Sequence, residues 1–305
     1  MAGGQERILR RRIKSVQSTK KITRAMELIA ASRIVKAQAR VHAAAPYAEG
    51  ITHVVQELAA SGAGQSHPLL TPREQAGTVA HIVVTADRGL CGGYNANVIR
   101  AAEAELREHG HREYSLTVVG RKAEGYFRYR NYRIDGAFAG FSDAPGYEDA
   151  RAIAAAVSRR FTAGELDLVQ IIYTRFVSAG TQEVVVRPLM PLDTEGFAAQ
   201  SDAASGRRAD FEFEPSPEGI LNELLPRYVE ARVFAALLNA AASEHAARQR
   251  AMKAATDNAD ELIRNLTRVM NRARQDSITT EIMEIVGGAE ALKSGEHDSD
   301  LLPAD

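Results

Sequence analysis

The chain has 305 residues, enough for about two domains of usual size. Hydrophobic residues make up 45% of it, but aromatic residues make up only 6% and tryptophan is absent, so we expect a lean core of closely packed, alanine-rich helices. A single cysteine excludes an intramolecular disulfide framework and a cysteine-based metal cluster. The formal net charge of −1 conceals a strongly basic N-terminal segment.

No apolar run approaches the roughly 20 residues that a membrane-spanning helix needs. The N-terminus passes from small polar residues directly to arginines and lacks the apolar centre of a secretory signal. We therefore expect a cytosolic protein without direct membrane insertion, whose connection to any membrane is made by a partner.

Residues 6–40 read as one helix, free of Gly and Pro and rich in Ala, Arg, Lys and Ile. Eleven of these residues are Lys or Arg and only two are acidic. We expect Pro46 to kink this helix without ending it, so that residues 1–60 form one element. The sparse apolar stripe predicted for it is Leu9, Ile13 and Val16, an interruption at Lys20, and then Ile22, Met26 and Ile29.

Residues 217–290 read as a much longer helix, with Pro226 as a possible kink. Within it, steps of three and four describe a coiled-coil seam of about five heptads. A helix of roughly seventy residues is on the order of 100 Å long and cannot bury itself in one domain. The N-terminal helix is the expected antiparallel partner. The predicted seam is Leu238, Ala241, His245, Arg248, Met252, Ala255, Ala259, Leu262, Leu266, Val269 and Ala273.

Two features interrupt this seam. His245 and Arg248 occupy seam positions, where a buried charge is costly, although long side chains can reach outward to water. After Ala273 the apolar phase slips, and a new stripe begins at Ile278 and continues through Ile282 and Ile285. We interpret the slip as the point where the helix faces something other than its partner helix.

Residues 78–192 alternate short β-branched runs with helical patterns, which predicts a small Rossmann-like α/β domain around a mostly parallel sheet. The last two strands are close in sequence, so we expect them to form an antiparallel hairpin. Residues 137–146 are predicted to be a loop. The predicted strands are 78–86, 114–120, 166–176 and 181–192, and the predicted helices are 94–110, 121–130 and 148–164.

Two polar segments flank the long final helix. Residues 193–216 form a loop rich in Gly, Ser, Asp and Pro. We expect the helix to end at Gly287 and Gly288 or a few residues later, and residues 293–305 to be a disordered polar tail. The predicted fold class is therefore α/β, with a long antiparallel coiled coil of the terminal helices and an inserted Rossmann-like domain.

The glycine-containing loop at residues 87–93 follows a predicted strand and opens a helix, which is where phosphate-binding loops lie. Its glycine spacing matches neither the dinucleotide fingerprint nor the P-loop, and a tight turn explains it without a ligand. Cys91 is interpreted as a small packed side chain rather than a nucleophile. The eight histidines show no metal-site spacing, and no nucleophile–base pair stands out. We expect no cofactor, no metal and no catalysis by this chain alone.

The basic N-terminal helix allows two interpretations. One-sided positive charge is the electrostatic signature of nucleic-acid binding, so a coiled-coil nucleic-acid-binding or scaffold protein is the alternative. Because this helix is also needed as a coiled-coil partner, we favour contact with acidic protein surfaces and expect no nucleic acid.

Four long segments, spread in order along nearly the whole chain, resemble a single family. They are SVQSTKKITRAMELIAASR at 15–33, ADRGLCGGYNAN at 86–97, the run from 224 to 258 and ARQDSITTEIMEIVGGAEAL at 273–292. They resemble the gamma subunit of the bacterial F-type, proton-translocating ATP synthase. The resemblance implies a non-catalytic central-stalk rotor subunit that couples proton translocation through a membrane ring to conformational changes at the beta-subunit catalytic sites.

The resemblance also implies partners and a location. The paired helices would enter a ring of alpha and beta subunits, and the middle domain with its neighbouring loops would form a foot against the epsilon subunit and the membrane c-ring. The protein would be peripheral, on the cytoplasmic face of the bacterial cell membrane.

Contact residues follow from the same motifs. Phe213 and Glu214 match foot positions near the ring, with Phe in place of a common Tyr. The residues matched to beta-subunit contact are Met26 with the nearby Lys20, Lys21 and Arg24, and Arg274 and Gln275 with Thr279 and Glu281 one turn on.

Overall fold

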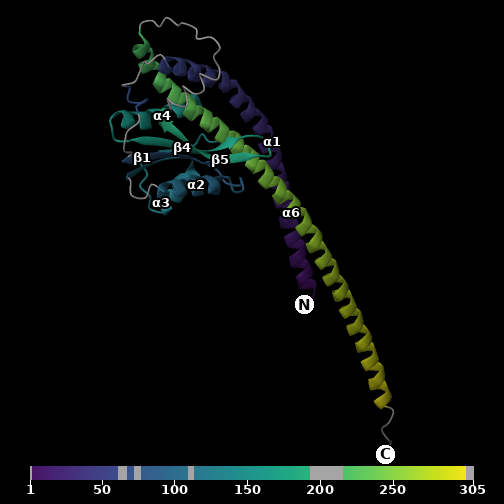
Figure 1. Ribbon diagram of the computed structural model, residues 1–305. Helices are drawn as coiled ribbons and strands as arrows, with labels where there is room; N and C mark the ends of the chain where they lie inside the picture. The colour runs from purple at the N-terminus through teal and green to yellow at the C-terminus, as the bar shows by residue number, and fades with distance from the viewer. Residues whose placement is uncertain (1, 61–66, 72–76, 109–112, 193–215, 300–305) are drawn as a thin grey trace, which may run out of the picture. The chain divides into compact units, whose positions relative to one another are not determined.

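The computed structural model describes residues 2–60, 67–71, 77–108, 113–192 and 216–299. The chain divides into two compact units. The stalk unit comprises Met1–Met26 and Met252–Asp305, and the domain unit comprises Glu27–Ala251. Two long helices, α1 (Ala2–Ala60) and α6 (Pro217–Ser299), contribute residues to both units (Figure 1).

Proline does not end either long helix. Pro46 lies inside α1, as predicted, and Pro226 lies inside α6. An internal proline removes one backbone hydrogen bond and costs about 3 kcal/mol or more, so the surrounding helix must be held by packing. Ile51, Val55 and Leu58, which follow Pro46, are all buried in the core of the domain unit. This packing explains why α1 continues to Ala60.

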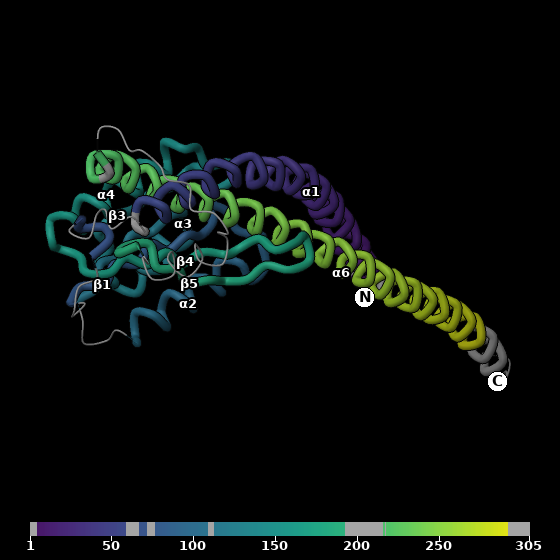
Figure 2. Tube along the Cα trace, turned by 45° about the horizontal axis from the view of Figure 1, so that its top comes forward, coloured from purple at the N-terminus to yellow at the C-terminus, as the bar shows by residue number. Residues whose placement is uncertain are grey.

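In the stalk unit α1 and α6 run antiparallel and side by side (Figures 1 and 2). The Thr23 and Thr256 hydroxyls are 2.8 Å apart, and Lys20 forms an ion pair with Asp260. Moving towards the N-terminus of α1 therefore corresponds to moving towards the C-terminus of α6. The predicted antiparallel pairing is confirmed by these two contacts.

The predicted seam of α6 is shifted at every second position in this unit. Met252, Ala259 and Leu266 are buried as predicted. Leu262 and Val269, however, are 40% and 49% exposed. The residues that follow them, Ile263 and Met270, are partly buried instead. Likewise Thr256 is buried, whereas Ala255 was the predicted seam residue. Ala255/Thr256, Leu262/Ile263 and Val269/Met270 are adjacent pairs of similar size, so periodicity alone could not choose between the two stripes. The seam of α6 is Met252, Thr256, Ala259, Ile263, Leu266, Met270 and Ala273.

The predicted stripe of α1 is also wrong after Val16. Lys20 does not interrupt the seam but belongs to it, because it reaches Asp260. Thr23 is buried next, whereas Ile22 is 61% exposed. Within the domain unit Ile29 is likewise 54% exposed, while Ala30 and Ile34 are buried. The less exposed positions of α1 keep a regular heptad spacing, but polar residues such as Lys20 and Thr23 occupy some of them.

The phase slip after Ala273 coincides with the end of the partner helix. Ala2 lies eighteen positions before Lys20, so it is level with the residue eighteen positions beyond Asp260, which is Ile278. Ile278, Ile282 and Ile285 are all at least half exposed. These isoleucines form no second seam with α1.

The predicted end of α6 is wrong. The helix passes through Gly287 and Gly288 and continues to Ser299, so residues 293–299 are not a disordered tail. Each helical glycine costs about 1 kcal/mol relative to alanine, but Glu, Ala, Leu and Lys on both sides are strong helix formers. Residues 300–305 lie outside the described part of the chain.

The domain unit contains a five-stranded sheet of order β3-β2-β1-β4-β5. Strands β1 to β4 are parallel where they pair, and β5 pairs antiparallel with β4, which confirms the predicted hairpin. The strands are β1 (Thr78–Val84), β2 (Glu113–Val119), β3 (Gly136–Phe138), β4 (Leu168–Phe176) and β5 (Gln182–Met190), and the shorter helices are α2 (Tyr94–Glu108), α3 (Arg121–Tyr129) and α4 (Tyr147–Thr162).

Strand β3 was not predicted, because two of its three residues fall in the predicted loop 137–146. Three residues that begin Gly-Ala have no detectable period and little β propensity. The Gly120 N–H donates to the Phe138 carbonyl at 2.8 Å, so tertiary pairing holds this short edge strand in place.

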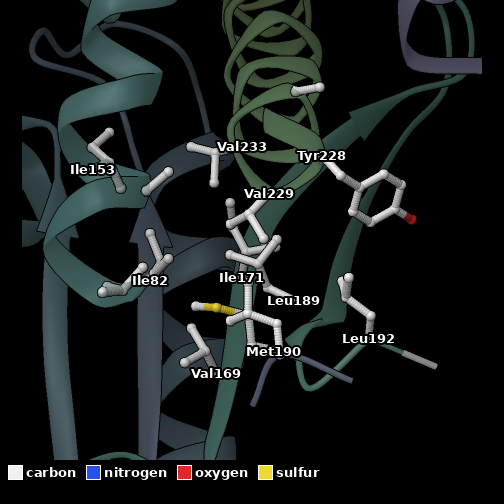
Figure 3. Close-up of a cluster of buried hydrophobic side chains, with 14 of the residues drawn as sticks. Ile82, Ile153, Val169, Ile171, Leu189, Met190, Leu192, Tyr228, Val229 and Val233 are labelled. Carbon is white, nitrogen blue, oxygen red and sulfur yellow. The ribbon is translucent and has the colours of Figure 1, made fainter. Parts of the chain in front are cut away.

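Helices cover both faces of the sheet. Ile82 points to the face covered by α4, α6 and the later part of α1, where it shares a core with Ile153, Val229 and Val233 (Figure 3). The next residue, Val83, points to the opposite face, among residues of α2 and α3. Full burial of one such side chain contributes about 1.5–3 kcal/mol, so the larger core fixes α6 to the sheet over residues 221–240. The predicted mixed α/β fold with long terminal helices is confirmed.

Candidate functional site

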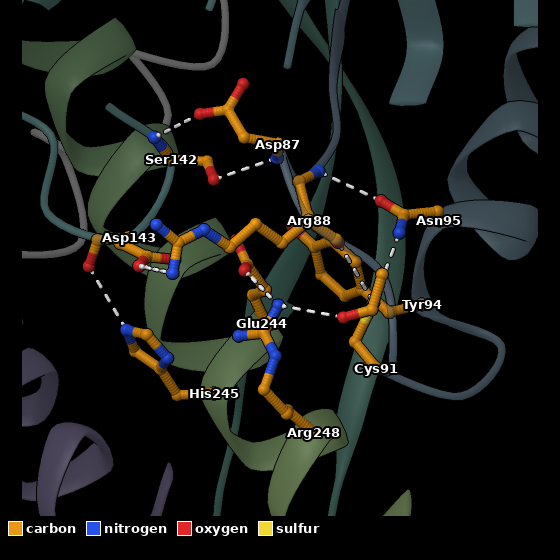
Figure 4. A network of polar contacts seen from close by, with 12 residues as sticks. Asp87, Arg88, Cys91, Tyr94, Asn95, Ser142, Asp143, Glu244, His245 and Arg248 are labelled. Carbon is orange, nitrogen blue, oxygen red and sulfur yellow. Dashed lines mark hydrogen bonds and ion pairs between the residues drawn. The ribbon is translucent and has the colours of Figure 1, made fainter. Parts of the chain in front are cut away.

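A network of polar side chains lies where the β1–α2 and β3–α4 loops meet α6 in the domain unit (Figure 4). Asp87, just beyond β1, accepts hydrogen bonds from the backbone N–H groups of Arg121, Gly140 and Ser142 at 3.1, 2.9 and 3.0 Å. Burial alone would raise the pKa of the Asp87 carboxyl. The hydrogen bonds from these N–H groups and from the Ser142 hydroxyl outweigh burial and place the pKa below its ordinary value. Asp87 therefore holds two loops together as a carboxylate.

A buried ion pair on α6 faces the first of these loops. Arg248 donates to the Glu244 carboxylate at 2.6 Å and to the Gly89 carbonyl at 3.3 Å. The Glu244 side chain is 1% exposed and that of Arg248 is 9% exposed. Burial raises the pKa of Glu244, whereas Arg248 and the Ser142 hydroxyl act in the opposite direction. Arg248 thus compensates the charge of the Glu244 carboxylate, whose burial without a partner would be costly in free energy.

Asp143, in the β3–α4 loop, contacts both long helices. Its carboxylate accepts from Arg33 of α1 at 2.6 Å, and its backbone carbonyl lies 3.1 Å from Nε2 of His245 on α6. Arg88 lies 3.9 Å from the same carboxylate. Burial is the main reason that the pKa of His245 lies below its ordinary value, which favours a neutral imidazole that donates to the Asp143 carbonyl.

Polar groups in and beside the glycine-containing loop at residues 87–93 form hydrogen bonds with one another. Asn95 accepts from the Ala86 N–H at 2.9 Å and donates to the Cys91 sulfur at 3.1 Å. Leu90 and Gly92 have positive φ angles of 62° and 58°, so this turn uses left-handed conformations. Tyr94 of α2 donates to the Ala240 carbonyl at 3.2 Å and fixes the loop to α6.

Cys91 is 1% exposed, and burial raises the pKa of its thiol even though Arg248 lies nearby. This environment suits a packed side chain rather than a nucleophile. Among the described residues, no group of three or more His, Cys, Asp or Glu side chains is placed to hold a metal ion. Within the same part of the chain, no helix is long and apolar enough to cross a membrane.

The residues matched to beta-subunit contact on α1 lie in the stalk unit. Lys21 and Arg24 are exposed, Met26 is partly buried, and Lys20 turns inward to Asp260. Two of the four side chains are therefore exposed, and Lys20 lies in the seam.

The residues of α6 that were matched to beta-subunit contact lie at the end of its paired part. Arg274, Gln275, Thr279 and Glu281 are all exposed. The Thr279 hydroxyl donates to the Gln275 carbonyl at 3.0 Å within the same helix. Phe213 and Glu214, the foot positions, lie outside the described residues.

Sequence reasoning missed most of the loop network. Asp87 and Asp143 carried no spacing signal because their partners are distant in the chain, and Glu244 was not singled out although its partner Arg248 lies four residues on. The polar residues His245 and Arg248 in an apolar seam were the available signal, and the structure explains them by contact with the α/β domain.

Comparison with known proteins extends these observations. A family profile described as ATP synthase matches residues 5–292. The ATP synthase gamma chain of Frankia casuarinae is 55% identical over 301 residues, covering 96% of this chain and 99% of the relative. This chain belongs to the ATP synthase gamma chain family. The gamma chain of Streptomyces coelicolor is 46% identical over 304 residues, with 98% of this chain and 99% of the relative covered.

Solved structures agree with the gamma-chain assignment. The central stalk and c-ring structure of the Tetrahymena thermophila mitochondrial ATP synthase contains a chain that matches at a TM-score of 0.60 and 27% identity, over 77% of this gamma chain and 99% of that chain. A chain of the Euglena gracilis mitochondrial ATP synthase matches at a TM-score of 0.68 over 99% of this chain and 98% of that chain. Its identity is 18%, so this second likeness concerns the fold alone.

Proposed function

We propose that this gamma chain is the non-catalytic rotor subunit of the central stalk, coupling proton translocation through a membrane ring to conformational changes at the beta-subunit catalytic sites. The stalk unit would turn inside a ring of alpha and beta subunits. The domain unit and the segment around Phe213 and Glu214 would contact the epsilon subunit and the c-ring, with the complex on the cytoplasmic face of the cell membrane.

The observation that carries this proposal is the presence of large apolar side chains on the outer surface of the stalk unit. Its seam includes the polar residues Lys20, Thr23 and Thr256 among apolar ones, whereas Leu262 and Val269 face outward. A helix pair that leaves large apolar side chains on its outer surface is suited to enclosure by other proteins. The unpaired part of α6 continues this pattern, with Ile282, Met283 and Val286 all exposed.

Charge on the same surface supports contact with acidic partners. Residues 5–26 contain eight Lys or Arg residues and one acidic residue. Lys21 and Arg24 are among the exposed ones, and we propose that they, with Met26, meet acidic beta-subunit segments as the chain turns. Arg274, Gln275, Thr279 and Glu281 would meet a beta-subunit loop at the other contact zone.

Rotation follows from unequal contacts around the stalk. The two helices present different side chains in each direction, so the three surrounding beta subunits experience different surfaces at any moment. A surface that binds one beta conformation more strongly than another shifts that subunit's equilibrium. Turning the stalk would then change each catalytic site in sequence, without any catalytic group on this chain.

Reconstitution tests the proposal. Alpha and beta subunits, epsilon subunit and membrane sector are combined in vesicles with or without this chain, and ATP hydrolysis and ATP-driven proton uptake are measured together. We expect proton uptake only when the chain is present, and co-purification of the chain with alpha, beta and epsilon subunits. Equal coupling of proton uptake to ATP hydrolysis without the chain would contradict the proposal.

A further inference from the structure

Six side chains of the domain unit, which we call the collar, attach both long helices to loops of the α/β domain. Asp143 contacts Arg33 of α1 and His245 of α6. The collar residues are Arg33, Asp143, Glu244, His245, Arg248 and Arg250.

Within a stretch of seven residues, α6 forms hydrogen bonds to three separate loops of the α/β domain. His245 meets the β3–α4 loop at Asp143, and Arg248 meets the β1–α2 loop at Gly89. Arg250 donates to the carbonyls of Ala179 and Gly180, in the β4–β5 turn, at 2.8 and 3.0 Å. These are the last described attachments of α6 before the domain unit ends at Ala251.

The collar differs physically from the apolar core that holds the earlier part of α6. The larger apolar core contains α6 residues from Leu221 to Ala240. Apolar contact is non-directional, so it resists separation better than it resists rotation of a helix about its own axis. Hydrogen bonds to fixed carbonyl groups weaken steeply when their angles change. The collar therefore opposes axial rotation of α6 at a place where the core no longer does.

Burial makes one part of the collar sensitive to substitution. Glu244 and Arg248 form an i,i+4 pair that is almost wholly buried, whereas Glu124 and Arg128 on α3 form an i,i+4 pair of similar length that is largely exposed. Removing one partner of a buried pair leaves an uncompensated charge, but exposed pairs contribute little. The exposed pair is a matched control.

We propose that the collar residues are positioning residues that lock α6 against axial rotation in the α/β domain, so that torque passes between the domain and the helix without slip. This inference rests on the proposed rotor function. Arg248 is its central member, because it connects the buried Glu244 to the Gly89 carbonyl. Methionine has a similar length and lacks the donors, so Arg248→Met removes both contacts.

The test uses the complete ATP synthase in vesicles, with native chain, Arg248→Met and the control Arg128→Met. Protons pumped per ATP hydrolysed are compared at equal assembly. We expect the ratio to fall by about 2- to 30-fold in Arg248→Met, the range in which substitutions in coupling networks act, while hydrolysis continues. Arg128→Met should match the native chain. Native-like coupling in a well-assembled Arg248→Met complex would overturn the proposal, whereas failure of the native chain to couple would reject the rotor function itself.

Amide hydrogen exchange of the purified chain supplies a second readout. Backbone amides in residues 85–97 should exchange about tenfold faster in Arg248→Met, and those of α3 should not change. Unchanged exchange at 85–97 would also overturn the proposal. Should Arg248→Met fail to assemble, Arg250→Met, whose side chain is exposed, carries the same coupling prediction and the same contrary outcome.

Discussion

Thr23 of α1 and Thr256 of α6 meet hydroxyl to hydroxyl, 2.8 Å apart, in the seam of the stalk unit. Each hydroxyl also lies close to a carbonyl of its own helix, Thr23 to Lys20 at 3.0 Å and Thr256 to Met252 at 2.9 Å. Two hydroxyl oxygens this close need a proton between them, so one threonine donates across the seam and the other is left to donate to its own helix. A polar pair at this depth specifies helix register at a cost in stability.

The first prediction concerns this pair. Thr23→Val or Thr256→Val alone should lower the free energy of unfolding by about 1 kcal/mol, because one cross-seam hydrogen bond is lost beside a remaining hydroxyl. The double variant should recover most of that loss, since two valines pack as an apolar layer. Urea unfolding of the four chains gives the coupling energy. Purely additive losses in the double variant would show that the hydroxyls do not interact.

The limits of sequence reasoning are clear in this unit. Steps of three and four predicted a long seam, and Met252, Ala259 and Leu266 are buried accordingly. The choice between Leu262 and Ile263 depends on which side the partner helix approaches. That side is set by contacts such as Lys20–Asp260, which join residues 240 positions apart.

The collar was harder still to predict. Its members come from α1, the β3–α4 loop and α6, and no local spacing connects these three segments. His245 and Arg248 signalled only that something polar faces α6. The contact residues on the stalk surface came from a family resemblance, and their contacts stay predictions.

The second prediction concerns Gly120, at the end of β2. Its φ is +92°, and a Cβ there would lie 2.2 Å from the Thr85 carbonyl oxygen. Gly120→Ala should therefore destabilise the domain unit by about 3 kcal/mol or more, because both backbone strain and a backbone clash are introduced. Denaturant unfolding measures the change.

Gly125 is the matched control, since it lies inside α3 and a Cβ there would meet nothing within 4 Å. Gly125→Ala should raise the free energy of unfolding by about 0.5–1 kcal/mol. A Gly120→Ala chain as stable as the native one would contradict the described loop geometry.

The third prediction is a pH dependence centred on Asp87. Because its pKa is lowered in the folded chain, its contribution to stability is complete above the unfolded pKa of about 3.9 and is lost as the pH falls through the folded value. Asp87→Asn replaces an acceptor oxygen by a donor that faces backbone N–H groups. It should cost about 1–2 kcal/mol at pH 7, and progressively less below pH ~4. Urea unfolding across this range tests the sign, and a difference that grows on acidification would contradict it.

The fourth prediction concerns Arg274 and Gln275, both exposed on α6. Arg274→Ala and Gln275→Ala should each slow steady-state ATP turnover of the assembled complex while leaving assembly unchanged, because they would remove the proposed contacts to a beta-subunit loop. The loss expected for a charge-assisted hydrogen bond of about 1.5–3 kcal/mol is about tenfold or more for Arg274. Lys253→Ala, an exposed substitution elsewhere on α6, is the comparison. Normal turnover in both variants would reject the proposed role of these residues.

The central claim is that this gamma chain turns within the complex, and direct observation of rotation tests it best. Tyr129 is 84% exposed on α3, so a Tyr129→Cys change in a Cys91→Ala background gives one accessible attachment site for an optical probe. With the alpha–beta ring fixed to a surface, we expect the probe to rotate in one direction in steps when ATP is added, and to stop when ATP is removed. A probe that stays fixed while the ring hydrolyses ATP at its native rate would contradict the rotor function.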